Sequence, residues 1–240
     1  MQVYPVLDLM GGVVVRGVAG DRYRYRPICS GLATSSRPLD VARAIRKRFD
    51  LHSLYVADLD SIAGEGIDRE SLGELVDDDF RLLVDAGVRS KEDAAALLEL
   101  GDLDVIAALE TVPSPRVLRS VIEAIGEGRV IFSLDMKHGQ ALGSREGWPA
   151  GVDEVASVAG AAGVRRMVVL DLAAVGVGGG TPHLDICRRW KAWRPELEII
   201  TGGGVRGVED LCAMAEAGVD GALVASALHD GRLRREDIGV

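Results

Sequence analysis

The sequence predicts a (β/α)₈ barrel, the TIM-barrel fold, from three observations: its length, its alternation of short apolar runs with helical patterns, and an internal repeat. The chain has 240 residues, and a closed barrel of this class typically needs about 250. We therefore expect one domain over residues 1–240, made of half-barrels at about 1–125 and 126–240.

Eight short apolar runs are typical of buried parallel strands. In chain order they are VYPVLDL, LHSLYVADL, DFRLLVDAG, LDVIAAL, RVIFSLD, RRMVVLDL, LEIITGG and VDGALVAS. Helical patterns separate most of them, at residues 39–49, 90–100, 113–125, 152–162, 182–193 and 207–217. Strand and helix in such alternation imply a parallel sheet with right-handed crossovers.

An internal repeat decides between a closed barrel and an open sheet. Residues 82–108 align without a gap onto 199–225, with 9 of 27 positions identical. FSLD, which ends at Asp135, likewise repeats PVLD, which ends at Asp8. Two four-stranded halves that close on each other give eight strands around a pseudo-two-fold axis.

Composition excludes several classes of protein. The net charge is −9, and the chain lacks the clustered Lys and Arg that a nucleic-acid or membrane surface requires. The first residues resemble a strand and not a signal peptide, so we expect a cytoplasmic protein. The four histidines have no metal-ligand spacing, and we expect neither a metal nor a cofactor.

Two aspartates end strands at equivalent places in the two halves. Active sites of these barrels lie at the C-terminal ends of the strands, where Asp8 ends the first strand and Asp135 the fifth. They should face each other across the mouth, and unequal surroundings can push the pKa values of two such carboxyl groups apart. We expect a catalytic acid and base; the alternative is that each caps a helix or binds an Arg.

Three further aspartates, Asp58, Asp60 and Asp171, also lie at strand ends. Carboxylates in such places often accept hydrogen bonds from backbone N–H groups and so hold loops. We favour that role for them over catalysis.

A glycine-rich segment follows the seventh strand and predicts a phosphate site. Glycines allow a tight turn that brings backbone N–H groups and the positive end of a helix against a phosphate. A plain tight turn is the alternative. The expected phosphate-binding residues are Gly202, Gly203, Gly204, Ala225 and Ser226, and Thr201 is an expected substrate contact.

The equivalent segment of the first half, VDAGVRS, is a degraded copy of this site. It has Asp85 and Ala86 in place of two glycines, and a carboxylate repels a dianion. Leu109 stands where the second half has Ser226, which removes a hydroxyl donor. Arg89 could restore a weak anion site, although we favour a role on the helix surface.

Three loops can reach the mouth. Trp148 follows the fifth strand, and its indole could stack on a planar ligand or cover the barrel rim. The first loop, DRYRYRP at residues 21–27, could clamp an anionic or aromatic ligand or lie in solvent. The loop GGGT, at 178–181, could fold over a ligand, whereas we do not expect His138 to join the site.

These residues together resemble the histidine-biosynthesis barrels, a family that contains a ribonucleotide isomerase and its cyclase sister. The resemblance covers nearly the full length, with VLDL, GGVVVRG, VADLD, GVRS, FSLD, GW and TGGGVRG in the family's order. It is nearer to the isomerase, because the cyclase typically has a Cys before its first aspartate. It implies a monomer, whereas the cyclase works with a glutaminase.

The resemblance also implies roles for individual residues. The isomerase performs an Amadori rearrangement, which moves a proton between two carbons of an opened ribose. The resemblance makes Asp8 the general base and Asp135 the general acid. It makes Arg16 and Trp148 substrate contacts.

Several positions depart from the isomerase, whose substrate has a phosphate at each end. They are Asp85 and Ala86 for glycines, Ala108 and Leu109 for Gly-Ser or Gly-Thr, Leu170 for Thr, and Val175, Gly176 and Val177 for Asp-Gly-Thr. This pattern is similar to a divergent paralogue group associated with one-carbon metabolism through tetrahydromethanopterin.

We therefore expect a sugar-phosphate isomerase of the Amadori type that uses the two aspartates on a phosphorylated substrate, either the histidine intermediate or a smaller sugar phosphate with a single phosphate. Two alternatives stay open: an enzyme of tetrahydromethanopterin or one-carbon cofactor synthesis, and a non-catalytic phosphometabolite-binding barrel. Retention of both aspartates disfavours the non-catalytic barrel. The changes after the sixth strand disfavour the histidine intermediate as the substrate.

Overall fold

Eight parallel strands form a closed ring in the computed structural model, which describes residues 1–143 and 147–239. Around the ring they are β1 (Gln2–Met10), β4 (Ser53–Asp58), β5 (Arg81–Asp85), β6 (Leu103–Ala108), β7 (Val130–Lys137), β9 (Arg166–Asp171), β10 (Glu198–Gly202) and β11 (Gly221–Val224). The ring closes where β11 pairs with β1, from Gln2 opposite Gly221 to Pro5 opposite Val224. The predicted (β/α)₈ barrel and its eight strands are confirmed.

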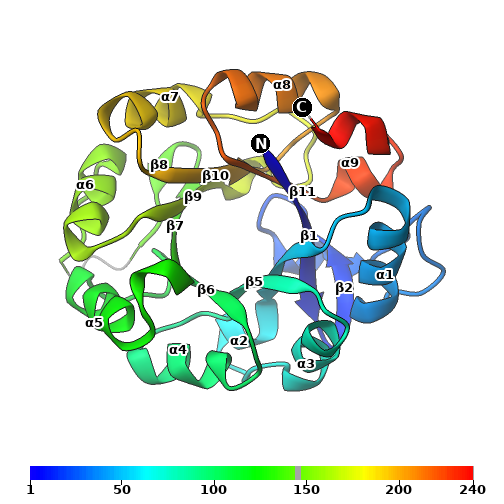
Figure 1. Cartoon of the computed structure of the whole chain (residues 1–240), viewed down its shortest axis with the longest axis horizontal. Helices are drawn as coiled ribbons and strands as arrows, with labels where there is room; N and C mark the ends of the chain where they lie inside the picture. Colours follow the sequence, from blue (N-terminus) through cyan, green and yellow to red (C-terminus); the bar gives the residue numbers. More distant parts are fainter. Residues whose placement is uncertain (144–146, 240) are drawn as a thin grey trace.

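Helices surround this ring as an outer layer (Figure 1). Six were predicted, each within two residues of its bounds: α1 (Pro38–Phe49), α4 (Lys91–Leu98), α5 (Pro115–Ile125), α6 (Val152–Ala162), α7 (Leu184–Trp193) and α8 (Val208–Glu216). Ser90 and Ser114 cap α4 and α5 by accepting backbone N–H bonds, which fixes where these helices begin. Among the described residues, every helix is too short or too polar to cross a bilayer.

Further elements were not predicted; most span too few residues to show a clear period, although the helix Arg69–Asp77, with 9 residues, is as long as one that was predicted. They are α2 (Leu59–Ala63), α3 (Arg69–Asp77), α9 (Ser226–His229) and the 3₁₀ turns η1 (Arg22–Arg24), η2 (Glu127–Arg129), η3 (Leu172–Ala174) and η4 (Arg235–Gly239). Three more strands, β2 (Val13–Arg16), β3 (Arg26–Pro27) and β8 (Gln140–Ala141), lie beyond the ring and pair antiparallel.

Both strands that end near the predicted catalytic aspartates continue into hairpins, β1 into β2 and β7 into β8. Gly11 and Gly12 have positive φ in the first turn, as His138 and Gly139 do in the second. Two-residue hairpin turns of type I′ need positive φ at both positions. The hairpins carry the wall of the barrel past the aspartates.

An apolar layer fills the middle of the barrel. Side chains of a strand alternate between its two faces, so every second residue points inward. Each strand of the ring contributes one large apolar side chain to this layer. In ring order these are Tyr4, Tyr55, Leu83, Ile106, Ile131, Val168, Ile200 and Leu223.

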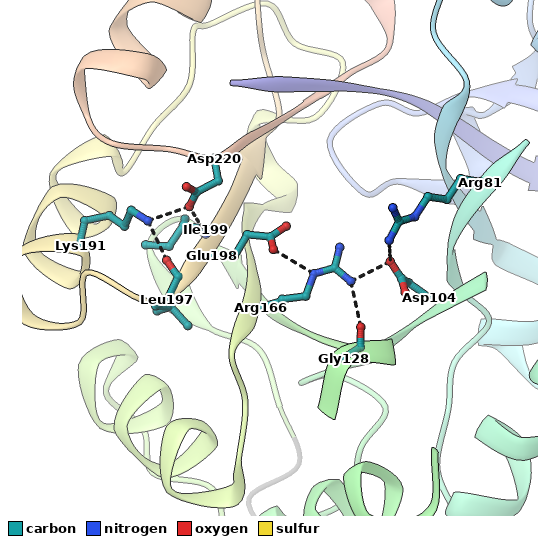
Figure 2. A network of polar contacts seen from close by, with 9 residues as sticks. All are labelled: Arg81, Asp104, Gly128, Arg166, Lys191, Leu197, Glu198, Ile199 and Asp220. Atoms are coloured by element: carbon teal, nitrogen blue, oxygen red, sulfur yellow. Dashed lines mark hydrogen bonds and ion pairs between the residues drawn. The ribbon is translucent and has the colours of Figure 1, made fainter. Parts of the chain in front are cut away.

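Ion pairs fill the barrel on the N-terminal side of that layer (Figure 2). Arg166 Nη1 lies 2.7 Å from Asp104 Oδ2, and its Nε lies 3.2 Å from Glu198 Oε2. Arg81 lies 3.5 Å from the same Asp104 oxygen. Each of these residues stands two positions before an apolar inward residue on its strand, so two cations and two anions share one layer at this end of the barrel, with Arg81 at its exposed edge.

Candidate active site

A cavity of about 210 Å³ opens at the C-terminal ends of the strands, on the other side of the apolar layer. One side of it is acidic, and its lining includes Asp8, Tyr55, Asp85, Glu110 and Asp135. The other side comes from the loops after β10 and β11 and the hairpin of β1, and its lining includes Arg16, Gly203, Gly204, Ala225, Ser226, His229 and Arg232.

Strand alternation brings three carboxyl groups into this cavity. Asp8 and Asp135 stand four residues after the inward side chains of β1 and β7, and Asp85 stands two after that of β5. Because β1 and β7 are the first and fifth of eight strands around the ring, Asp8 and Asp135 face each other across it.

Asp135 is the most isolated of the three carboxyl groups. It is 5% exposed, and its Oδ1 accepts a hydrogen bond of 2.7 Å from the Ser133 hydroxyl. Its Oδ2 is buried and accepts no hydrogen bond from the described residues. Burial raises the pKa of Asp135 well above its usual value, and the charges of Glu110 and Asp85 raise it further. These surroundings therefore favour the protonated form of the group.

Asp8 is only partly buried and faces the cavity from the opposite strand. Burial raises the pKa of Asp8 to about 6, although the positive charge of Arg22 opposes the shift. At neutral pH this group is mostly ionised. The surroundings therefore favour the protonated form of Asp135 more strongly than that of Asp8.

Asp85 is a third carboxyl group on the acidic side. It is 6% exposed; Oδ1 accepts from the Gly87 N–H at 3.1 Å, and Oδ2 from the Tyr55 hydroxyl at 3.5 Å. Burial raises the pKa of Asp85 to about 7, and the charge of Glu110 raises it further, against the Gly87 hydrogen bond. From the sequence we interpreted Asp85 only as a residue that replaces a glycine and so weakens phosphate binding in the first half.

The remaining strand-end aspartates hold loops. Asp58 accepts the backbone N–H groups of Ser61 and Asp68 at 3.0 and 2.7 Å. Asp60 accepts the Gly11 N–H at 2.6 Å, which ties the turn after β1 to α2.

Asp171 does the same work after β9. It accepts backbone N–H groups from His138, Gly139 and Ala173, and its Oδ2 lies 2.9 Å from His183 Nε2. The loop-holding role that the sequence favoured for these aspartates agrees with their hydrogen bonds.

On the other side of the cavity, Gly203 and Gly204 form a tight turn with φ of 82° and 90°. A Cβ atom on Gly204 would lie 2.5 Å from the Gly180 carbonyl oxygen, so no other residue fits there without a shift of the backbone. The Gly180 N–H in turn donates to the Gly204 oxygen. This contact joins the loop at 178–181 to the predicted phosphate loop.

Two of the predicted ligand contacts, Gly202 and Thr201, lie behind the cavity wall. A Cβ atom on Gly202 would lie 2.6 Å from Leu223, so this glycine allows two strands to pack closely. Thr201 points outward, is buried, and donates its hydroxyl to the Val169 oxygen at 2.7 Å. Neither residue is among those that line the cavity.

Two arginines reach the phosphate side, and one carboxylate positions both. Asp230 Oδ2 lies 2.6 Å from Arg16 Nη2 and 3.3 Å from Arg232 Nη2. His229 beside them is buried and lies 2.9 Å from the Ser30 hydroxyl. Burial lowers the pKa of His229 to about 4, so this ring is neutral at pH 7.

The equivalent site of the first half is filled by the protein itself. Arg89 donates to the carbonyl oxygens of Gly87 at 2.6 Å and Ile62 at 2.7 Å, so its guanidinium is engaged with the backbone. Ala108 and Leu109 are buried among apolar residues. Ala86 accepts the Ser61 hydroxyl through its carbonyl oxygen.

Trp148 does not line the cavity in this structure. Its ring is 8% exposed and stacks on Phe132, with centroids 5.3 Å apart, and its Nε1 donates to the Val112 oxygen at 3.1 Å. Phe132 points outward from β7, so the indole covers the outside of the barrel wall. The stacking role expected from the sequence would require the indole to leave this packing.

The first loop contributes two side chains to the cavity, Arg22 and Tyr25, whereas Tyr23 is 94% exposed. Arg22 Nη1 donates to the Leu59 oxygen at 3.2 Å, which holds the guanidinium near Asp8. His138 lies in the turn between β7 and β8 and is not among the residues that line the cavity.

Sequence reasoning did not place Tyr55, Glu110, His229 or Arg232 in the site. Strand alternation could have found Tyr55, since it is an inward residue of β4. No pattern identifies Glu110 and Arg232, because both lie in loops whose course depends on tertiary packing.

The chain is similar to known proteins over its full length. The sequence profile of a family described as "Histidine biosynthesis protein" matches residues 2–234. The chain is 32% identical to an uncharacterized protein of Methanocaldococcus jannaschii, over 99% of this chain and 97% of that one. It is 29% identical to an imidazole-4-carboxamide isomerase of Thermus thermophilus, over 99% and 98% of the two chains. An isomerase of the same name from Alkaliphilus metalliredigens is 30% identical, over 98% and 96%.

Proposed function

The chain belongs to the histidine biosynthesis protein family, and from that premise we propose that it is an Amadori-type isomerase of a metabolite with one phosphate. Asp8 acts as the base and Asp135 as the acid. One observation carries the proposal: two carboxyl groups face one cavity from opposite strands, one with a pKa of about 6 and the other with a pKa raised well above its usual value.

The chemistry needs only these two protonation states. Asp135, protonated, gives its proton to the ring oxygen of an N-substituted ribosylamine as the C1–O bond breaks, which leaves an iminium group. Asp8, ionised, takes the proton from C2, and the electron pair of that C–H bond moves to form an enamine. Return of a proton from Asp8 to C1, with loss of the C2 hydroxyl proton back to Asp135, then gives the aminoketose, an isomer of the starting sugar.

The phosphate side supports a single anionic end on the substrate. Gly203 and Gly204 bring backbone close to the cavity, and Arg16 and Arg232 supply positive charge there. On the first-half side Arg89 donates to backbone oxygens and Asp85 presents a carboxyl group. A second dianion would find repulsion at that end.

A non-catalytic phosphate-binding barrel is the alternative class. Such a barrel has no need for a buried carboxyl group without a partner, since an unsatisfied buried polar group destabilises the fold. Asp135 is such a group, and this favours catalysis.

Turnover of two defined compounds tests the proposal. An N-aryl ribosylamine 5-phosphate carries one phosphate, and the substrate named in the relatives' isomerases carries two phosphoribosyl groups. We expect conversion of the first to the aminoketose, followed by NMR in D₂O, with faster turnover than of the second. Asp8→Asn and Asp135→Asn should each lower kcat by roughly 10²- to 10⁴-fold.

Asp60→Asn is the matched control, because Asp60 holds a rim loop and does not line the cavity. It should retain activity. Preferred turnover of the compound with two phosphates would contradict the one-phosphate substrate. Tight binding of phosphate esters with no isomerisation and no exchange of the C2 proton would contradict catalysis and support the binding protein.

A further inference from the structure

We propose that the acidic side of the cavity binds a protonated amino group, so that the substrate carries a phosphate at one end and a cationic nitrogen at the other. The phosphate end rests on the proposed function, whereas the cationic end rests on Asp85, Glu110 and Asp135. These three residues come from β5, the loop after β6, and β7.

The arrangement of strands separates the two ends. β5 and β10 are the third and seventh of eight strands around the ring, so Asp85 lies across the cavity from the turn at Gly203 and Gly204. A ligand whose phosphate lies at that turn therefore presents its far end to the acidic side. Its central carbons then lie between Asp8 and Asp135.

Asp135 Oδ2 points to a missing partner on the acidic side. This oxygen belongs to a side chain that is 95% buried, lines the cavity and accepts no hydrogen bond from the described residues at that atom. An ammonium group offers three N–H donors and no acceptor, so it can bond to the carboxylates of Asp85 and Glu110 and to the carbonyl oxygen of a protonated Asp135. A phosphate offers acceptors, which Asp135 can satisfy only with its own proton.

At the opposite end of the barrel, charged side chains are paired with side chains of opposite charge. There Arg81 and Arg166 lie within 3.5 Å of Asp104, and Arg166 also contacts Glu198. Positive and negative side chains balance in that layer. At the mouth, the carboxyl groups of Asp8, Asp85, Asp135 and Glu110 share the cavity lining. A cationic ligand would balance their negative charge, as the two arginines do at the other end of the barrel.

The electrostatic state of the empty cavity agrees with this reading. The groups that face the carboxyls are Asp8 from β1, Tyr55 from β4, Glu110 from the loop after β6 and Arg22 from η1. Burial raises the pKa of Asp85 to about 7, and the positive charge of Arg22 opposes the shift only in part. A bound cation would favour the ionised form of Asp85 and release its proton, whereas a bound dianion would favour protonation of Asp85.

Three families of linear phosphate esters of matched chain length test the inference: aminoalkyl phosphates, hydroxyalkyl phosphates and alkane bisphosphates. Titration calorimetry at about pH 7 measures their affinities, and repetition in two buffers of different ionisation enthalpy measures proton release. We expect the amine to bind about tenfold or more tightly than the alcohol, the effect of one charged hydrogen bond. The bisphosphate should bind most weakly, and amine binding should release protons.

Two variants locate the effect. Asp85→Asn keeps an oxygen acceptor for the Gly87 N–H, and Glu110→Gln changes an exposed side chain, so neither should disturb folding. Each should bring the affinity of the amine close to that of the alcohol and leave the affinity of the alcohol unchanged. Asp21→Asn, in the exposed first loop outside the cavity lining, is the matched control and should keep the preference.

The possible outcomes separate this inference from the proposed function. Equal affinity for amine and alcohol, or tighter binding of the bisphosphate, would overturn the cationic end while the phosphate site stands. Binding of none of the esters would overturn the phosphate site, and the inference with it. If Asp85→Asn does not fold, the ranking by the unaltered protein and by Glu110→Gln still decides.

Discussion

Asp135 and Asp171 end neighbouring strands, and the protein shifts the pKa values of their carboxyl groups in opposite directions. Burial alone would raise both. Asp171, however, has His183 and three backbone N–H groups around it, and these hydrogen bonds lower its pKa. For Asp135, burial and the charges of Glu110 and Asp85 outweigh the hydrogen bonds from the Ser133 hydroxyl and the Glu110 backbone, and its pKa rises. Asp135 points into the barrel and Asp171 points outward to the loops, and this difference in direction decides whether the pKa is raised or lowered.

The pH dependence of the proposed activity follows from this difference. Asp8 must be ionised to act as the base, so kcat/KM should rise as the pH increases through about 6. Asp135 must be protonated to act as the acid, so kcat/KM should fall at a pH above its raised pKa. We expect a bell-shaped profile, with its acidic limb near pH 6 and a basic limb set by the raised pKa of Asp135.

Asp60→Asn should leave both limbs of that profile in place, because Asp60 has no role inside the cavity. A profile without an acidic limb near pH 6 would be inconsistent with Asp8 as the base. Kinetic assays at saturating and limiting substrate separate effects on the free protein from effects on the complex.

At the scale of elements, strands and long helices could be predicted from the sequence, because buried apolar runs and helical periods are properties of the chain itself. The short helices α2 and α9 could not, since four or five residues show no period. The same limit applies to the position of Trp148. Its indole lies on Phe132 because of packing between a loop and a strand, which the sequence does not specify.

The aspartates of the candidate site could be predicted from the alternation of inward and outward residues along each strand. Counting inward positions from the strand centres separates Asp8, Asp85 and Asp135 from Asp58 and Asp171, which point outward. Strand-end position alone treats all five alike. The loop residues Glu110 and Arg232 come to the cavity through tertiary packing and needed the structure.

The turn at Gly203 and Gly204 gives a prediction for an element of the phosphate site. Gly204→Ala adds a Cβ atom 2.5 Å from the Gly180 oxygen, at a residue with φ of 90°, so the turn must shift. We expect affinity for phosphate monoesters to fall by about tenfold or more and stability to fall by about 1–3 kcal/mol. Calorimetry and urea unfolding measure the two effects.

Gly128→Ala is the matched control for that variant. Gly128 has no atom within 4 Å of an added Cβ and lies at the other end of the barrel, in η2. Its replacement should leave phosphate affinity unchanged. Unchanged affinity in Gly204→Ala as well would remove this turn from the phosphate site.

At the scale of the whole molecule, buried ion pairs that stabilise the fold lie at the N-terminal end of the barrel strands, and the candidate active site lies at the C-terminal end. Arg166→Leu leaves Asp104, which is 5% exposed, with a single distant partner in Arg81. Breaking a buried ion pair in this way costs about 3–5 kcal/mol. Urea unfolding should show that loss, while ligand affinity of the folded protein stays the same.

Arg165→Leu is the control at the next residue, since Arg165 pairs with Glu127 at 2.9 Å on the exposed surface. An exposed pair contributes less than about 1 kcal/mol. Equal destabilisation by the two variants would show that burial of the Arg166 layer does not matter for stability.

The layer of Arg81, Asp104, Arg166 and Glu198 also limits how a ligand can enter and leave the barrel. Together with the apolar side chains above it, this layer fills the interior, as in other barrels of this class. Substrate and product therefore enter and leave through the same opening of the cavity, which lies between the hairpin of β1 and the loops after β9 to β11. For an isomerase, whose product keeps the mass and the phosphate of its substrate, departure competes directly with arrival, and the product acts as a competitive inhibitor.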